Sequence, residues 1–143
     1  MPMPESGRTH DEIVSSLHDL RRNDARWQEG RTFGLVYDGG SEVHAIAEEA
    51  ARMYLHENAL NTIAMPSLAQ IQREVVGNMA ALLHGDDASG FMTSGGTESI
   101  LMAVKAARER GRAERDIDHG EIVVPTSAHA AFHKGGHYFG LDV

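Results

Sequence analysis

The sequence predicts an α/β fold in which an N-terminal helical segment leads into a mostly parallel sheet. Apolar residues recur at helical spacing through residues 9–83. Short apolar runs then alternate with helical segments through residues 91–143, which is typical of a parallel sheet covered by helices. A glycine pair joins the first of these runs to the helix that follows, as in a strand-to-helix turn.

The first helix is expected to begin at Thr9 and to continue for about three turns. Thr9 and Glu12 stand three residues apart, which is the spacing of a capping box, in which a hydroxyl and a carboxylate each bond to a backbone N–H. Residues 1–8 are polar and are expected to form a loose tail. After a glycine-rich loop at residues 30–41, a second helix is expected from about Ser41 to His56.

A third helix is expected to start at Pro66, with Ser67 and Gln70 as a capping pair, and to end at Gly85-Asp86-Asp87. Alternating strands and helices follow, and Gly111 is expected to stop the longest of these helices. Their expected ranges are a strand at 91–93, a helix at 97–110, a strand at 121–125, a helix at 128–138 and a strand at 141–143. The sheet would be incomplete, so we expect open edges that need further sequence or partner chains.

Composition limits the classes of function. The net charge is −8, and this argues against a nucleic-acid surface, which needs a basic stripe. The chain has no cysteine, so disulfides, thiolate nucleophiles and cysteine zinc sites are excluded. No stretch approaches the roughly 20 apolar residues that span a bilayer. The chain is expected to be soluble and cytoplasmic, with no membrane segment.

The run Ser94-Gly95-Gly96-Thr97 predicts an anion site at a strand-to-helix turn. The first N–H groups of a helix have no intrahelical partner and carry the positive end of the helix dipole. Glycines let the backbone approach an anion closely, and the hydroxyls of Ser94 and Thr97 can donate as well. The run is neither a Walker loop nor a GxGxxG loop. The alternative is a tight turn without a ligand.

Two segments resemble the sphingosine-1-phosphate lyase family. One is the run from Thr93 to Ser99, continued as Ile-Leu-Met-Ala-Val-Lys-Ala-Ala-Arg through residue 108. The other is Ser-Ala-His-Ala-Ala-Phe at residues 127–132, directly after the apolar run 121–125. The resemblance covers most of the chain from about residue 30 onward, and it matches about the first third of a family member.

This resemblance implies a pyridoxal-phosphate (PLP) enzyme of fold type I, the aspartate aminotransferase-like architecture. Residues 67–143 would form the first part of its large PLP-binding domain, and residues 1–66 the tail, helices and glycine-rich loop on the substrate side. Gly95, Gly96 and Thr97 would bind the cofactor phosphate. His129 would be the catalytic residue that stacks on the cofactor ring and can move protons there. A homodimer with shared active sites is also implied.

The same resemblance implies a function for the whole enzyme of which this would be the N-terminal part. It is a lyase that cleaves the C2–C3 bond of a phosphorylated long-chain amino alcohol, giving a fatty aldehyde and phosphoethanolamine. The alternatives are a PLP-dependent amino-acid decarboxylase and a non-catalytic fragment. The family places its Schiff-base lysine downstream of the matched region, and neither Lys105 nor Lys134 matches it. The chain alone is therefore expected to be inactive.

Two further residues are candidates for the substrate phosphate by resemblance. Tyr37, in the glycine-rich loop, aligns with a family tyrosine near that phosphate. Asn61 stands where many relatives carry a histidine, and an amide can donate a hydrogen bond but supplies no charge. The alternative for both residues is ordinary loop structure.

The spacing of His129, His133 and His137 raises a second possibility for the last helix. Histidines four residues apart share a helix face and form a known zinc-ligand pair. No carboxylate stands in register with them and the chain has no cysteine. We therefore predict no metal site, and we expect His133 and His137 to lie on a solvated face.

Overall fold

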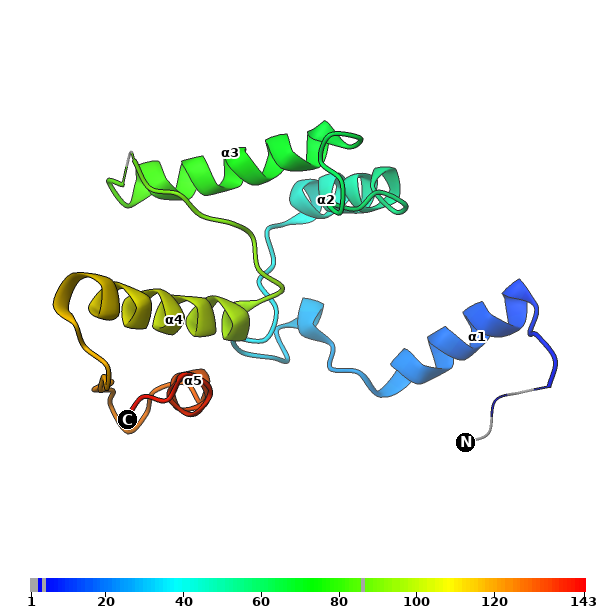
Figure 1. Ribbon diagram of the computed structural model, residues 1–143. Coiled ribbons are helices and arrows are strands. Elements are labelled where there is room, and N and C mark those ends of the chain that lie inside the picture. Colours follow the sequence, from blue (N-terminus) through cyan, green and yellow to red (C-terminus); the bar gives the residue numbers. More distant parts are fainter. Residues whose placement is uncertain (1–2, 4, 86) are drawn as a thin grey trace. The chain divides into compact units, whose positions relative to one another are not determined.

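The computed structural model describes residue 3, residues 5–85 and residues 87–143. The chain divides into two compact units, Met1–Glu57 and Asn58–Val143 (Figure 1). The helices of the first unit are α1 (His10–Leu20), η1 (Arg21–Asn23), η2 (Trp27–Glu29) and α2 (Ser41–Met53). Those of the second are α3 (Pro66–Leu82), α4 (Gly96–Arg115) and α5 (Ala131–Phe139).

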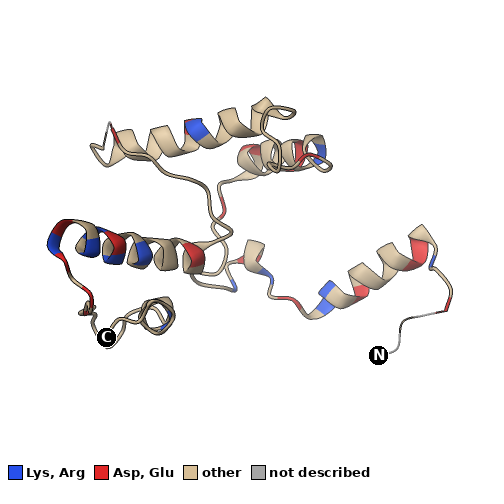
Figure 2. Cartoon of the chain, viewed as in Figure 1, with Lys and Arg blue, Asp and Glu red and all other residues tan. Residues whose placement is uncertain are grey.

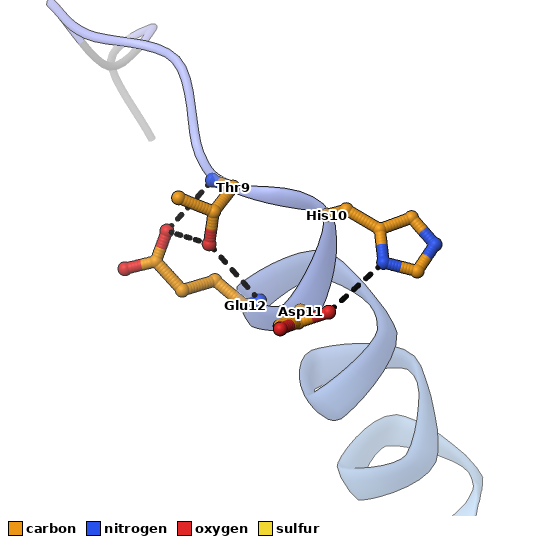
Figure 3. Close-up of polar contacts among 4 residues, drawn as sticks. All are labelled: Thr9, His10, Asp11 and Glu12. Carbon is orange, nitrogen blue, oxygen red and sulfur yellow. Dashed lines mark hydrogen bonds and ion pairs between the residues drawn. The ribbon is translucent and has the colours of Figure 1, made fainter.

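The predicted capping box at the start of α1 is confirmed (Figure 3). The backbone N–H and the hydroxyl of Thr9 both donate to Glu12 Oε2, at 2.7 and 2.8 Å, and the N–H of Glu12 donates to the Thr9 hydroxyl at 3.3 Å. These bonds to the charged form, the one from the Thr9 backbone first, lower the pKa of Glu12. A short sequence pattern was sufficient here because every partner lies within one turn. Of the tail expected at residues 1–8, residues 1, 2 and 4 lie outside the described residues.

A cluster of polar contacts joins the glycine-rich loop to α2 within the first unit. Asp38 Oδ1 accepts the N–H of Gly40 at 2.8 Å and lies 3.0 Å from His44 Nε2. The ring of Trp27 lies 5.6 Å from that of His44, centroid to centroid. Gly40 is the N-cap residue of α2 and has no side chain to cap the helix, so the carboxylate of Asp38 supplies a nearby acceptor instead.

Helix α3 begins at Pro66, as predicted, but the predicted Ser67–Gln70 capping pair is wrong. The N-cap residue is Met65, and it makes no side-chain cap. The amide of Gln70 donates to Glu74 instead, at 2.6 Å. Proline needs no capping partner at the first helical position, because it has no N–H and its φ is already helical. The helix ends at Leu82, before the predicted Gly85-Asp86-Asp87 stop, of which Asp86 lies outside the described residues.

Helix α4 continues past Gly111, so the predicted stop there is wrong. The helix reaches Arg115 and ends on Asp116, which is left-handed at φ 53°. The carbonyl of Gly111 accepts the N–H of Ile117 at 3.3 Å, so this glycine lies under the end of the helix. Arg110 pairs with Glu114 four residues on, at 2.9 Å, and such pairs support the added turn. Figure 2 shows basic and acidic residues alternating along this half of α4, whereas α3 has few charges.

The packed centre of the second unit is the crossing of α4 and α5. Figure 1 shows α5 end-on where α4 lies along the page, so the two helices cross steeply. Val104 and Ala131 are buried, with 7% and 2% of their surfaces exposed, and Gly135 faces Val104 so closely that an added Cβ would lie 3.2 Å from it. Arg108 fastens the crossing: it donates to the carbonyl of Phe139 at 2.9 Å and lies over that residue's ring.

The predicted mostly parallel sheet is not formed by the described residues. Within the described residues, the strand pairing consists of one parallel bridge between Glu121 and Asp142. In it, the N–H of Ile122 donates to the carbonyl of Asp142 at 2.7 Å. The segment at 91–93, predicted as a strand, has no strand partner. A ladder needs at least two extended segments side by side over several residues, and only these two segments meet. Val123, beside the bridge, is 96% exposed.

Many apolar side chains of the helices are exposed among the described residues. They include Ile13, Leu17 and Leu20 on α1, Val43, Ile46 and Met53 on α2, and Ile71, Val75, Met79 and Leu82 on α3. Apart from Met53, these residues belong to the apolar stripes whose spacing predicted the helices. The periodicity is real although nothing described covers the stripes. No described helix is both long and apolar enough to cross a membrane.

An alanine at position 136 should destabilise the packing of the C-terminal segment against α5. An added Cβ there would overlap the side chain of Val143 and lie 3.2 Å from the Leu141 carbonyl. We expect Gly136→Ala to lower the free energy of unfolding by about 1–3 kcal/mol, measured by urea denaturation followed by ellipticity at 222 nm. Gly77→Ala is the matched control, because it is helical and a Cβ there meets nothing within 4 Å; it should raise stability by about 0.5–1 kcal/mol. Equal effects of the two changes would contradict this packing.

Candidate functional site

The glycine pair forms the turn from which α4 begins. Gly95 is the N-cap residue, with φ 158° and ψ 179°, a region that only glycine populates readily. The first backbone bond of the helix runs from Ser99 N–H to the carbonyl of Gly95, at 3.1 Å. The N–H groups of Gly96, Thr97 and Glu98 precede it, so they have no partner inside the helix. An added Cβ at Gly95 or Gly96 meets nothing within 4 Å, so no other part of the described chain crowds the two glycines. N–H groups without helical partners beside two glycines are the kind of donor set that a phosphate would need.

The hydroxyl of Ser94 does not face this space as an anion donor, which corrects the expectation from the sequence. The N–H and the hydroxyl of Ser94 both donate to Glu98 Oε2, each at 2.7 Å. These bonds, the backbone one first, lower the pKa of Glu98. Sequence reasoning missed Glu98. Its signal was a serine before a helix with a glutamate soon after it, as at Thr9 and Glu12, but spaced by four residues instead of three.

A second pair of hydroxyls fixes the same turn. Thr93 Oγ1 and Ser99 Oγ lie 2.6 Å apart, and they lie 3.2 and 3.3 Å from the carbonyl of Gly95. One hydroxyl can donate to the other while the second donates to the carbonyl. Thr97 is exposed at the first turn of the helix. The turn is thus tied by its own side chains on both sides of Gly95, and its geometry does not depend on a ligand.

His129 lies two residues before α5, and its ring caps that helix. Its Nδ1 accepts the N–H of Ala131 at 3.1 Å. A nitrogen that accepts a hydrogen bond carries no proton, so this geometry assigns the ring proton of the neutral imidazole to Nε2. His129 is itself exposed, so the Nε2 edge is free to meet a ligand.

The three histidines do not share one helix face, because His129 precedes α5 whereas His133 and His137 lie within it. Both helical histidines are exposed. Among the described residues, no group of three or more His, Cys, Asp or Glu side chains is arranged to hold a metal ion.

The two candidate substrate contacts lie in different units. Asn61, in the second unit, accepts the N–H groups of Ile63 and Ala64 through Oδ1, at 3.0 and 3.2 Å. This bonding orients the side-chain amide so that its Nδ2 remains as a donor. Tyr37, in the first unit, is 91% exposed. Within the described part of the chain, no hydrogen bond joins Asn61 or His129 to the glycine turn.

A pocket of about 660 Å³ lies against one side of α4, away from all of these residues. Val104, Ile122, Phe132 and Leu141 are among its apolar lining residues, and Glu121 of the parallel bridge also lines it. None of the candidate site residues lines it, so the turn at Gly95 and Gly96, not this pocket, is the candidate ligand site.

Comparisons with known proteins now bear on this geometry. No protein-family model matches the chain. Sphingosine-1-phosphate lyase 1 of Mus musculus is 39% identical over 99% of the chain, which spans 25% of the mouse protein. A probable L-tyrosine/L-aspartate decarboxylase of Methanothrix thermoacetophila is 36% identical over 98% of the chain and 34% of that protein. A solved structure of a Burkholderia pseudomallei sphingosine-1-phosphate lyase matches all of this chain, which covers 35% of the Burkholderia chain, with a TM-score of 0.87 and 38% identity.

The chain spans about a quarter of the length of the curated lyases it matches. Lyases from mouse, Drosophila melanogaster and Saccharomyces cerevisiae align with 99% of it at 33–39% identity. Along its whole length the chain is thus a homologue of the N-terminal part of sphingosine-1-phosphate lyases.

Proposed function

We propose that this chain is the N-terminal part of a PLP-dependent lyase. The reaction would cleave the C2–C3 bond of phosphorylated sphingoid bases and give a fatty aldehyde and phosphoethanolamine. The observation that carries this is the preformed turn at Gly95 and Gly96, within a chain whose relatives named sphingosine-1-phosphate lyase match it from end to end.

Each residue of the turn has a defined task in this proposal. Gly95 gives the backbone the conformation that directs the N–H groups outward, and Gly96 and Thr97 donate theirs to the cofactor phosphate. The hydroxyl of Thr97 is a further donor. When bound, PLP supplies a ring that withdraws the electrons of the bond being broken. His129 would lie over that ring with its Nε2 proton available to donate, because Nδ1 is already occupied by Ala131 N–H.

The remaining machinery would come from outside this chain. Neither Lys105 nor Lys134 matches the family position of the lysine that binds PLP covalently. Lys134 instead lies 5.3 Å from the ring centre of Tyr138. The isolated chain is therefore proposed to be inactive. A homodimer with shared active sites is also proposed, and the uncovered apolar side chains of α1 and α2 support the need for a partner surface.

Asn61 and Tyr37 are proposed contacts of the substrate phosphate. The Asn61 amide has Nδ2 left to donate because Oδ1 is used inside its own turn. Tyr37 is exposed with its hydroxyl accessible. Both are neutral donors, so they would orient a phosphate but not neutralise its charge.

An amino-acid decarboxylase is the second candidate function, favoured by the 36% identical Methanothrix relative. The two candidates differ in what the first quarter of the enzyme must recognise, namely a phosphorylated long-chain amine or a small amino acid.

Two chimaeras test the choice between them. In one, this chain replaces the matching segment of the Burkholderia lyase; in the other, that of the Methanothrix decarboxylase. We expect the first to release a fatty aldehyde from a phosphorylated sphingoid base, and the second to release no carbon dioxide from tyrosine or aspartate. The isolated chain with PLP is the control and should do neither. The opposite pattern would contradict the lyase assignment.

Substitutions at the glycine pair test the phosphate turn. Gly95→Ala should abolish most binding of inorganic phosphate, because alanine is strained at φ 158° and ψ 179° and the turn must change. Gly96→Ala causes no such strain and no clash within the chain. A loss of phosphate affinity in this variant would therefore come from steric contact between the new Cβ and the bound anion. Phosphate titrations followed by amide NMR shifts measure both. Unchanged binding by Gly95→Ala would count against the turn as the site.

The tautomer of His129 is open to direct measurement. We expect the ring nitrogens at neutral pH to show a proton on Nε2 and a bare Nδ1, because Nδ1 accepts the Ala131 N–H. Long-range ¹H–¹⁵N correlation spectra of the imidazole report this pattern. His133, exposed on α5, is the matched control and should show no such fixed acceptor. A proton on Nδ1 of His129 would exclude the capping bond.

A further inference from the structure

Glu98 is hydrogen-bonded to the residue before the glycine pair, although its carboxylate is negative and cannot attract a phosphate. Its Oε2 atom accepts both donors of Ser94, at 2.7 Å each. Ser94 directly precedes Gly95, the N-cap residue that has no side-chain cap. The carboxylate of Glu98 therefore reaches back over the glycine pair and fixes the residue on its far side.

The start of α1 shows what this bonding does when no anion turn is present. There the N–H and hydroxyl of Thr9 donate to Glu12 Oε2 at 2.7 and 2.8 Å, the same pair of bonds as at Ser94 and Glu98. At α1 the threonine is itself the N-cap residue. At α4 the serine lies one residue further out, and the extra residue is Gly95. At α4 the serine–glutamate bonds therefore span the N-cap position, which Gly95 occupies, whereas at α1 the bonded threonine occupies that position itself.

We propose that Glu98 is the positioning residue of the phosphate turn, and that its negative charge also limits how tightly the turn holds its anion. By taking both donors of Ser94 it leaves the N–H groups of Gly95, Gly96 and Thr97 for the ligand. This inference rests on the proposed function, since it assumes that the turn binds a phosphate.

The two effects of Glu98 have opposite signs. Its hydrogen bonds organise the turn and so favour binding. Its charge repels a phosphate bound a few ångströms away, and because the two donors of Ser94 lower its pKa, that charge is present at neutral pH. Glutamine keeps an acceptor for Ser94 but removes the charge, whereas alanine removes both. The two substitutions therefore separate organisation from repulsion.

The test titrates inorganic phosphate into the ¹⁵N-labelled chain and follows the amide signals of Gly95 and Gly96. We expect Glu98→Gln to bind phosphate about threefold tighter than the unmodified chain, as the repulsion is lost. Glu98→Ala should bind several-fold more weakly. Glu12→Gln is the matched control, because it alters the same bonding at α1, and it should leave phosphate affinity unchanged. Equal or weaker binding by Glu98→Gln would overturn the role of the charge.

A second readout is independent of phosphate and covers the case in which Glu98→Ala does not fold. The amide signal of Ser94 should shift as pH falls through the lowered pKa of Glu98, and this titration should vanish in Glu98→Gln. A Ser94 signal that ignores pH in that range would overturn the positioning role. If phosphate moves neither Gly95 nor Gly96 in any variant while Ser94 still follows Glu98, the proposed phosphate site fails and the positioning of the turn by Glu98 stands.

Discussion

The close crossing of α4 and α5 is the constraint on which the second unit depends. Gly135 permits it because it carries no side chain where Val104 of α4 approaches, and Gly136 likewise leaves room for the C-terminal residue Val143 against α5. Both segments with candidate ligand chemistry are attached to it, since the glycine turn opens α4 and His129 caps α5. Few side chains of this unit are buried, so the α4–α5 contact is what holds the starts of these two helices in place relative to each other.

The glycine turn shows how backbone N–H groups at a helix start can be left without bonds from nearby hydroxyls. Nearby hydroxyls could compete for the same acceptors or collapse onto the open N–H groups. Here they are bonded elsewhere: Ser94 to Glu98, and Thr93 with Ser99 to the carbonyl of Gly95. The turn is ordered when the protein folds, so the proposed phosphate would not have to order it on binding.

The success of prediction from sequence followed the range of the interactions involved. The Thr9 capping box and the helix after the glycine pair depend on neighbours within one turn, and both are confirmed. The stop at Gly111 failed because glycine inside a helix costs about 1 kcal/mol, which side-chain pairs and packing can offset. The predicted sheet is not shown by the described residues beyond one bridge, because strand pairing depends on partners that are distant in sequence. The hydrogen bonds from Ser94 to Glu98 and from Ile63 to Asn61 Oδ1 were not predicted, because they depend on the rotamers of the side chains.

The carboxylate of Glu98 beside the turn also affects how the proposed site should respond to ionic strength. Anion sites built on lysine and arginine weaken as salt rises, because the attraction is screened. In this chain the net charge is −8, and the carboxylate that accepts the Ser94 N–H beside the turn is also negative. Monovalent salt would therefore screen a repulsion as well as the attraction of the helix dipole. If the turn binds phosphate as proposed, its affinity should change less with salt than that of a site built on lysine and arginine.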